Sequence, residues 1–171
     1  AQDMRNAIQT ISSNGKHLLS LVNDILDLSK VEANKLEVET LPVSLPLLLA
    51  EITALVSARI QQKNLSFTVT PELPLPQIIG TDPGRLKQIL LNLVSNSIKF
   101  TDRGGVEIQV RSNEETLTFS VIDTGIGMSE TELENLFEAF EQASDAINRN
   151  FGGTGLGLNI SKQLAHRLGG D

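Results

Sequence analysis

Four polar residues recur at helical spacing within residues 82–101, which form the segment DPGRLKQILLNLVSNSIKFT. At about 100° per residue they fall on one stripe, and apolar residues fill the rest of the helix surface. The stripe consists of Gln88, Asn92, Asn96 and Lys99. Such a stripe can hold an oxygen-rich, charged ligand, and the carboxamide oxygen of Asn96, with Asn92 nearby, suits Mg²⁺ directly or through water. A polar face that caps neighbouring loops explains the same stripe equally well.

The segment DTGIGM, residues 123–128, combines a carboxylate with two glycines directly after a predicted strand. Gly125 and Gly127 let the backbone approach a flat ligand, and Asp123 can accept a hydrogen bond from an exocyclic amino group such as that of adenine. The structural alternative is an Asx turn that closes the strand. Asp-Thr-Gly after a strand also occurs in one half of an aspartic protease dyad, but the hairpin–helix context and the second glycine argue against that class.

A third candidate site is the segment GGTGLGL, residues 152–158, which opens the last predicted helix. Glycines with exposed backbone N–H groups at a helix N-terminus can bind an anion. The segment is neither a Walker loop, which ends in Gly-Lys-Ser/Thr, nor a dinucleotide fingerprint, which must follow a strand. Alone it is a weak signal. Arg149 lies just before it and either reaches a phosphate or is a solvated charge.

The N-terminal part of the chain predicts a long bundle helix. Apolar residues recur in steps of four and three over residues 4–29, and a polar connector, residues 29–40, follows. Because this apolar stripe is wide, we expect its partner helices in a segment outside this chain or in a second chain. The alternative is a helix that packs on the domain's own core.

The rest of the chain predicts alternating helices and strands. The expected helices are residues 47–62, a helix with Thr81 or Asp82 as N-cap and Pro83 as first residue, a short acidic helix from Ser129 to Phe137 with Glu132 completing a capping box, and a last helix ending at Gly169. The expected strands are 65–70, 106–110 and 117–121, the last two as an antiparallel hairpin. Residues 138–152 are expected to form a mobile loop. This order favours an α+β two-layer sandwich with helices on one face of a mixed sheet.

Composition excludes several classes of function. The chain has 14 Lys and Arg against 21 Asp and Glu, a formal net charge of −7, and no basic cluster, so we expect no nucleic-acid partner. It has no cysteine for disulfides, thiolate metal sites or thiol nucleophiles. No apolar run approaches the roughly 20 residues that cross a bilayer, so we expect a cytoplasmic portion whose parent protein can still be membrane-anchored. His17 and His166, the two histidines, lie in patterns typical of packing or capping groups.

Taken together and in this order, the segments resemble the ATP-binding catalytic region of sensor histidine kinases, within the wider GHKL group of type II topoisomerases, heat-shock chaperone ATPases and mismatch-repair ATPases. NLVSNSIKFT is similar to the N box, DTGIGM to the G1 box, FEAFEQ to the F box and GGTGLGL to the G2 box. NDILDLSKVEANKLEVE is similar to the end of the second helix of the dimerisation and phosphoacceptor domain. The resemblance implies two parts, a partial dimerisation helix with its connector at residues 1–40 and a C-terminally truncated catalytic domain at residues 41–171.

The resemblance implies a Bergerat-type ATP-binding fold in which Asn96, with Asn92, lies at Mg²⁺ and Asp123 binds the adenine amino group. It also implies that Lys99 and Arg149 reach the phosphates and that a lid lies between the F and G2 boxes. The other implied nucleotide-binding residues are Gly125, Gly127, Phe140, Gly153, Thr154, Gly155, Leu156 and Gly157. Hydrolases and serine kinases of the group carry a Glu four residues before the magnesium Asn as general base. Asn92 has no carboxylate, which favours transfer to an imidazole over hydrolysis.

One feature of the family is absent from this sequence. The phosphoacceptor His, which is followed by Glu, has no counterpart here, and His17 does not stand in that context. We therefore expect a catalytic fragment that binds ATP and cannot phosphorylate itself. Its expected partners are the missing His-bearing helix, a second copy in a full-length homodimer and the receiver domain of a response regulator. The alternatives are a non-catalytic, nucleotide-gated interaction module and an ATP hydrolase of the same fold.

Overall fold

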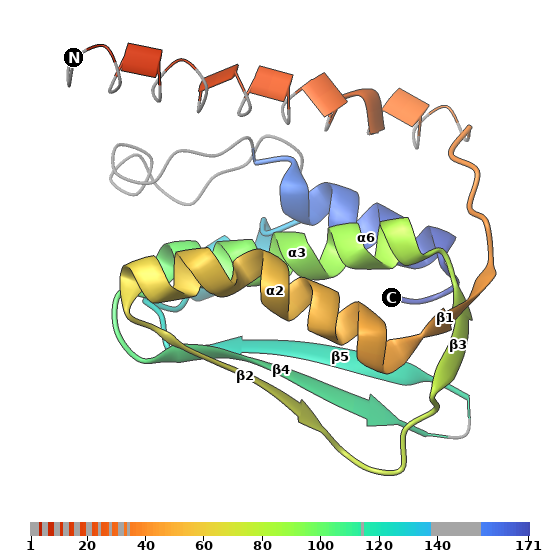
Figure 1. Ribbon diagram of the computed structural model, residues 1–171. Helices are drawn as coiled ribbons and strands as arrows, with labels where there is room; N and C mark the ends of the chain where they lie inside the picture. The colour runs from red at the N-terminus through yellow and green to blue at the C-terminus, as the bar shows by residue number, and fades with distance from the viewer. Residues whose placement is uncertain are drawn as a thin grey trace.

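The computed structural model describes residues 35–113, 115–137 and 155–171, together with residues 4, 7, 8, 11, 14, 15, 18, 19, 22, 23, 25–27, 29, 30 and 33. Its main sheet has three strands in the order β2 (Ser66–Pro71), β4 (Gly105–Ser112) and β5 (Leu117–Asp123). β2 runs parallel to β4, and β5 runs antiparallel to it. Three helices, α2 (Leu45–Lys63), α3 (Pro83–Phe100) and α6 (Gly157–Arg167), cover one face of this sheet (Figure 1). The predicted α+β two-layer sandwich with a mixed sheet is therefore confirmed.

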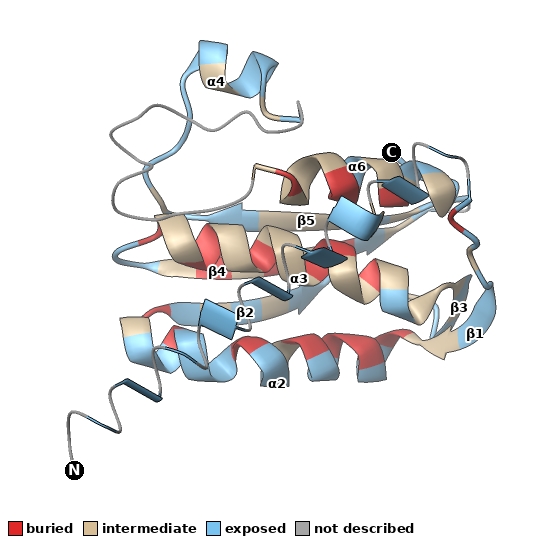
Figure 2. Ribbon diagram, turned by 90° about the horizontal axis from the view of Figure 1, so that it is seen from above, coloured by how far each residue is buried: buried red, intermediate tan, exposed pale blue. Residues whose placement is uncertain are grey.

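The main core lies between α2, α3 and the central strand β4. Alternate residues of β4 point at the helices, and Val106, Ile108 and Val110 are all buried. Ile52 of α2 and Val94 of α3 meet them from the helix layer and are fully buried. Buried positions recur along α2, α3 and α6, separated by intermediate or exposed ones (Figure 2). Because the apolar side of α3 packs on the sheet, its polar stripe lies on the side that faces away from the sheet.

A second sheet of two short strands was not predicted. β1 (Leu41–Ser44) pairs antiparallel with β3 (Ile78–Thr81), with Val43 opposite Ile79. β1 leads directly into α2, and β3 ends one residue before the N-cap of α3. The small sheet therefore joins the first turns of the two helices that hold the main core.

Local capping determines where α3 and α4 begin. Asp82 is the N-cap of α3, and its Oδ1 accepts hydrogen bonds from the backbone N–H groups of Gly84 (2.9 Å) and Arg85 (3.0 Å). The predicted capping box is present at α4 (Glu130–Glu134), where Ser129 and Glu132 each bond to the other's backbone N–H. α4 ends at Glu134 and is shorter than expected. The predicted loop 138–152 lies outside the described residues.

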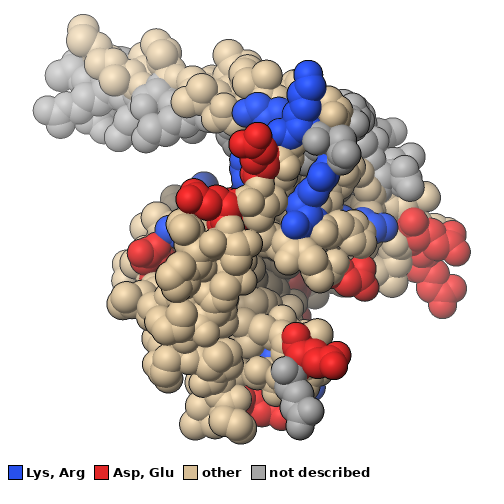
Figure 3. All heavy atoms as spheres, turned by 90° about the vertical axis from the view of Figure 1, so that its right-hand side faces the viewer, with Lys and Arg blue, Asp and Glu red and all other residues tan. Residues whose placement is uncertain are grey.

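The described residues between 4 and 30 are helical, and this N-terminal helix crosses the helix layer on the side away from the sheet (Figures 1 and 2). Its described large apolar residues are 45–71% exposed, so they are not packed in the domain's own core. Partner helices outside this chain stay a prediction. The connector is attached to the domain because Leu36 is buried in a second apolar cluster with Ile89, Leu156, Ile160 and Leu164. On the face drawn in Figure 3, acidic and basic side chains lie close together near this helix.

Candidate functional site

Asp123 lies at the end of β5, paired with Val106 of β4, and its side chain is exposed. Its Oδ1 accepts a hydrogen bond from the backbone N–H of Gly125 at 2.9 Å. The Asx turn considered as the structural alternative is therefore present. The turn uses one carboxylate oxygen, and Oδ2 has no hydrogen-bond partner among the described residues. The same geometry can thus close the strand and still accept a donor from a ligand.

Gly125 packs against the carboxyl end of α3 without room for a side chain. A Cβ at this position would lie 2.6 Å from the carbonyl oxygen of Phe100 and 2.9 Å from Oδ1 of Asp123. The backbone N–H of Ile126 donates to the same Phe100 carbonyl at 3.3 Å. Gly127 follows with a φ of +68°, a conformation that glycine adopts without strain. The G1 segment is therefore held directly against the last turn of the N-box helix.

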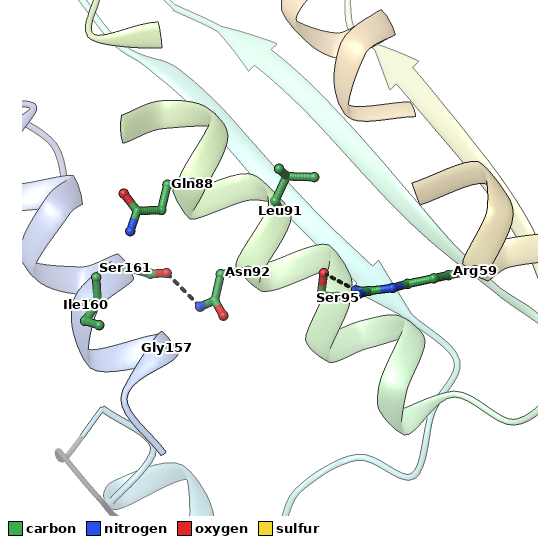
Figure 4. Close-up of a pocket in the computed structure, with 8 residues that line it drawn as sticks. All are labelled: Arg59, Gln88, Leu91, Asn92, Ser95, Gly157, Ile160 and Ser161. Atoms are coloured by element: carbon green, nitrogen blue, oxygen red, sulfur yellow. Dashed lines mark hydrogen bonds between the residues drawn. The ribbon is translucent and has the colours of Figure 1, made fainter. Parts of the chain in front are cut away.

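A pocket of about 300 Å³ lies between α2, α3 and α6. Figure 4 shows Asn92 of α3 pointing toward α6, where its Nδ2 donates to Oγ of Ser161 at 2.8 Å. Gly157, the last glycine of the G2 segment, sits so close to Asn92 that an added Cβ would overlap its side chain. The lining residues are Arg59, Gln88, Leu91, Asn92, Ser95, Gly157, Ile160 and Ser161. The N-box and G2 segments therefore meet across this pocket.

The polar stripe of α3 divides into two halves. In the first half, Asn92 bonds to Ser161, while Gln88 Nε2 donates to Asp27 Oδ2 at 2.9 Å and Gln88 Oε1 accepts from Arg85 at 2.9 Å. The bonds to Asp27 and Ser161 join α3 to two other helices, and the bond from Arg85 lies within α3. This half of the stripe therefore has a structural role, although it contacts helices and not the loops that the structural alternative expected.

In the second half of the stripe, the side chains of Asn96 and Lys99 have no hydrogen-bond partner within the described ranges. Lys99 Nζ lies 4.5 Å from the centroid of the Phe100 ring, and burial lowers the pKa of its ammonium group. The next residue, Thr101, has a fully buried hydroxyl that lacks a hydrogen-bond partner within the same ranges. Polar side-chain groups without a hydrogen-bond partner in the described ranges therefore gather near the carboxyl end of α3, where the Asp123 turn contacts Phe100.

The G2 residues have different environments. Gly155 has a φ of +69°. Leu156, which was predicted to bind the nucleotide, is only 1% exposed and is buried in a cluster with Leu36 and Ile160. Four predicted site residues lie outside the described residues, namely Phe140, Arg149, Gly153 and Thr154.

The structure adds residues near the site that sequence reasoning missed. Lys63, in the last turn of α2, donates from Nζ to the backbone carbonyls of Ile98 (2.9 Å), Lys99 (2.9 Å) and Thr101 (3.1 Å). Lys63 thus caps the carboxyl end of α3, where the last backbone carbonyls have no N–H donor within the helix. From sequence, a lysine in the last turn of a helix predicts a hydrogen bond to the carbonyls of its own helix, and Lys63 instead binds those of α3.

The described residues contain no group of three or more His, Asp or Glu side chains that could hold a metal ion. A Mg²⁺ ion at Asn96 would therefore take its other ligands from phosphate oxygens and water, which is its usual behaviour with nucleotides. Within the described ranges no helix has the length and apolar character needed to span a membrane.

The chain is similar to known ATPases and histidine kinases. Residues 81–171 match the family model described as "Histidine kinase-, DNA gyrase B-, and HSP90-like ATPase". The chain is 41% identical over 172 residues to the signal transduction histidine-protein kinase BarA of Escherichia coli (strain K12), covering 98% of this chain and 19% of that protein. It thus spans about a fifth of the length of this curated relative.

Two solved structures extend the comparison. The crystal structure of full-length ShkA in complex with AMPPNP superposes with a TM-score of 0.83 at 37% identity, over 96% of this chain and 34% of that one. The structure of the histidine kinase ThkA in complex with the response regulator protein TrrA shares the fold, with a TM-score of 0.67 at 23% identity. It covers 91% of this chain and 43% of that one.

Proposed function

This chain belongs to the family of histidine kinase-, DNA gyrase B- and HSP90-like ATPases, and we propose that it is the ATP-binding catalytic part of a sensor histidine kinase. The proposed reaction transfers the γ-phosphate of ATP to a histidine on a dimerisation helix that is not in this sequence, and a response regulator receiver domain then accepts the phosphoryl group. In this proposal residues 41–171 form the catalytic domain, and residues 1–40 are the end of the dimerisation domain and its connector. The parent protein is a homodimer, and this part of it is cytoplasmic.

One observation carries the proposal. Both glycine segments approach α3 so closely that a side chain would not fit, Gly125 against the Phe100 carbonyl and Gly157 against Asn92. Glycine is used where a backbone must come near a ligand or another chain segment. Two motifs that are distant in the sequence, the G1 and G2 segments, therefore both contact the helix that carries the N-box carboxamides and the lysine.

The described residues fit an adenine nucleotide. Asp123 keeps Oδ2 available for the exocyclic amino group of adenine while Oδ1 holds the turn. The buried Thr101 hydroxyl, which has no partner within the described ranges, belongs to the residue after Phe100, whose carbonyl contacts this turn. Gly127 leaves open space beside the turn, because no atom lies within 4 Å of the position that its Cβ would take.

The phosphate end of the nucleotide is assigned to the second half of the stripe and to the G2 segment. Asn96 offers a carboxamide oxygen to Mg²⁺, and Asn92 keeps its Oδ1 for a direct or water-mediated contact. Bound Mg²⁺ would neutralise charge on the phosphate oxygens. Lys99 and Arg149 add positive charge, and contact with phosphate would offset the desolvation that lowers the pKa of Lys99.

The identity of residue 92 favours phosphotransfer over hydrolysis. A hydrolase needs a group that accepts a proton from water, and the carboxamide of Asn92 cannot do so at neutral pH. Its Nδ2 is instead a hydrogen-bond donor to Ser161. A neutral imidazole is already nucleophilic, so transfer to histidine needs no such base.

The nucleotide site is tested by calorimetric titration of the chain with Mg²⁺-ATP. Asp123→Asn should weaken binding about 10- to 100-fold, because the hydrogen bond from adenine to a charged acceptor is lost. The control Glu72→Gln changes an exposed carboxylate that pairs with Arg111 on the sheet and should bind ATP as the wild type does. Equal affinities of the Asp123→Asn variant and the wild type, with the fold intact, would reject the assignment of Asp123.

Phosphotransfer is tested separately. The chain is mixed with a protein that carries the His-bearing helix of the parent and with [γ-³²P]ATP. We expect label on that helix that is stable in base and labile in acid, as phosphohistidine is, and none on this chain alone. Steady phosphate release without transfer would favour the hydrolase alternative.

A further inference from the structure

Arg59 reaches the pocket from a helix that none of the nucleotide-binding motifs includes. It lies on the exposed side of α2, and Figure 4 shows its side chain extending toward α3, where Nη1 donates to Oγ of Ser95 at 3.3 Å. Arg59 lines the same pocket as Asn92 and Gly157. The guanidinium therefore stands on the wall opposite the first turn of α6.

The lining of this pocket is positively charged, although the chain as a whole has a net charge of −7. Arg59 is the only charged residue among the eight that line it, and the others are polar neutral or apolar. Nearby cations are paired with carboxylates, as Arg85 is with Asp27 and Lys87 is with Glu51. Arg59 contacts only a neutral hydroxyl among the described residues, so the pocket has a positive charge that no described acidic group neutralises.

The chemistry of the lining specifies an anion. A guanidinium has five N–H donors in a planar fork, and the Ser95 contact uses one of them. The remaining donors match the oxygens of a phosphate, which Arg binds in a bidentate manner. Asn92 and Gly157 bring an N-box carboxamide and the G2 backbone to the same space, and the proposed function assigns both segments to the phosphates.

We propose that Arg59 binds the terminal phosphate of ATP, which makes it a phosphate-binding residue supplied by α2. This inference rests on the proposed function and adds to it a residue that discriminates ATP from ADP. Because the γ-phosphate is the group to be transferred, a cation beside it also stabilises the charge carried by that group.

The test compares affinities of the 171-residue chain for ATP and ADP, each with Mg²⁺. Arg59→Ala should weaken ATP binding about tenfold or more, because a charge-assisted contact to phosphate is lost, and should leave ADP binding within about twofold of the wild type. Arg59→Lys keeps the positive charge without the planar pair of donors, and its affinity for ATP should lie between those of the wild type and Arg59→Ala. Thermal unfolding of each variant checks that the fold is retained.

The matched control is Arg111→Ala. This exposed arginine lies on β4 and pairs with Glu72 at 2.7 Å, so its loss should change neither affinity. Arg59→Ala that weakens ATP and ADP equally, or weakens neither, overturns the inference and leaves the proposed function standing. A wild-type chain that binds neither nucleotide rejects the proposed function and the inference together.

Discussion

The pKa of Lys99 is held below its ordinary value, and the cause is partial burial at the end of α3. When a lysine is less basic in the folded state, the unfolded chain binds more protons between the two pKa values. The stability contribution of Lys99 therefore rises as pH increases through the folded pKa toward the unfolded value, and is lowest below it. NMR titration of the lysine Nζ groups should show Lys99 deprotonating at lower pH than an exposed lysine, and Mg²⁺-ATP should shift it upward. An ordinary pKa with no nucleotide shift would contradict both its burial and its proposed contact.

The two close glycines differ in what a methyl group would meet. At Gly125 it would meet a backbone carbonyl, that of Phe100, which is fixed in the last turn of α3. At Gly157 it would meet the end of the Asn92 side chain, which can rotate if it gives up its bond to Ser161. Gly125→Ala should therefore cost about 1–3 kcal/mol in urea unfolding, as overpacking does, and Gly157→Ala about 1 kcal/mol, as one hydrogen bond does. The reverse order would show that α3 and the G1 turn can move apart.

At the scale of single residues, the sequence predicted local roles such as helix caps better than it predicted which distant residues bond to each other. Ser129 was predicted as a cap, and so was Thr81 or Asp82, of which Asp82 is the cap, because the pattern that makes a cap lies within four residues. Asn92 and Asn96 were treated as one site, but Asn92 bonds to Ser161, 69 positions away, and Asn96 does not. Arg59 gave no signal, because an exposed arginine on an amphipathic helix is ordinary until its neighbour across the pocket is known.

At the scale of elements, α3 depends on its first turn. Asp82 accepts from two backbone N–H groups of that turn, and its Oδ2 also accepts from the backbone N–H of Glu39 in the connector at 3.3 Å. Asp82→Ala should lower the free energy of unfolding by about 0.5–2 kcal/mol, the usual cost of an N-cap. Asp82→Ser keeps a capping oxygen and should recover most of that loss in the same urea experiment. Equal losses for Ala and Ser would mean that the cap does not set the stability of α3.

The elements that the sequence did not predict are short and paired over long distances. β1 and β3 have four residues each, too few for alternation to be recognised, and Pro42 lies within β1. The hairpin of β4 and β5 was predicted because its turn is local. The parallel pairing of β2 with β4 joins strands about 40 residues apart, and no local pattern specifies which strands pair in parallel.

At the scale of the whole molecule, the connector is more firmly attached than its polar composition indicates. Leu36 is buried in a cluster with Leu156, the residue that precedes α6, and Val38 packs against the same cluster, so two side chains of the connector contact the G2 segment's end of the domain. One leucine in a polar stretch gives no periodic signal, which is why it was not singled out. The N-terminal helix itself is attached to α3 through Asp27.

Asp27 accepts from Arg85 at 3.2 Å and from Gln88 at 2.9 Å, and its side chain is only 16% exposed. Asp27→Ala leaves both donors on α3 without their acceptor, which should weaken docking of the N-terminal helix by about 1–3 kcal/mol. We expect faster hydrogen exchange and protease cleavage near residues 25–35, with no change in exchange of the β4 core. Asp27→Asn, which keeps an acceptor without the charge, should have a smaller effect, and Asn23→Ala at an exposed position of the same helix should have none. If Asp27→Ala left exchange near residues 25–35 unchanged, Leu36 and the connector alone would hold the helix, because the polar contact with α3 would add nothing to the docking energy.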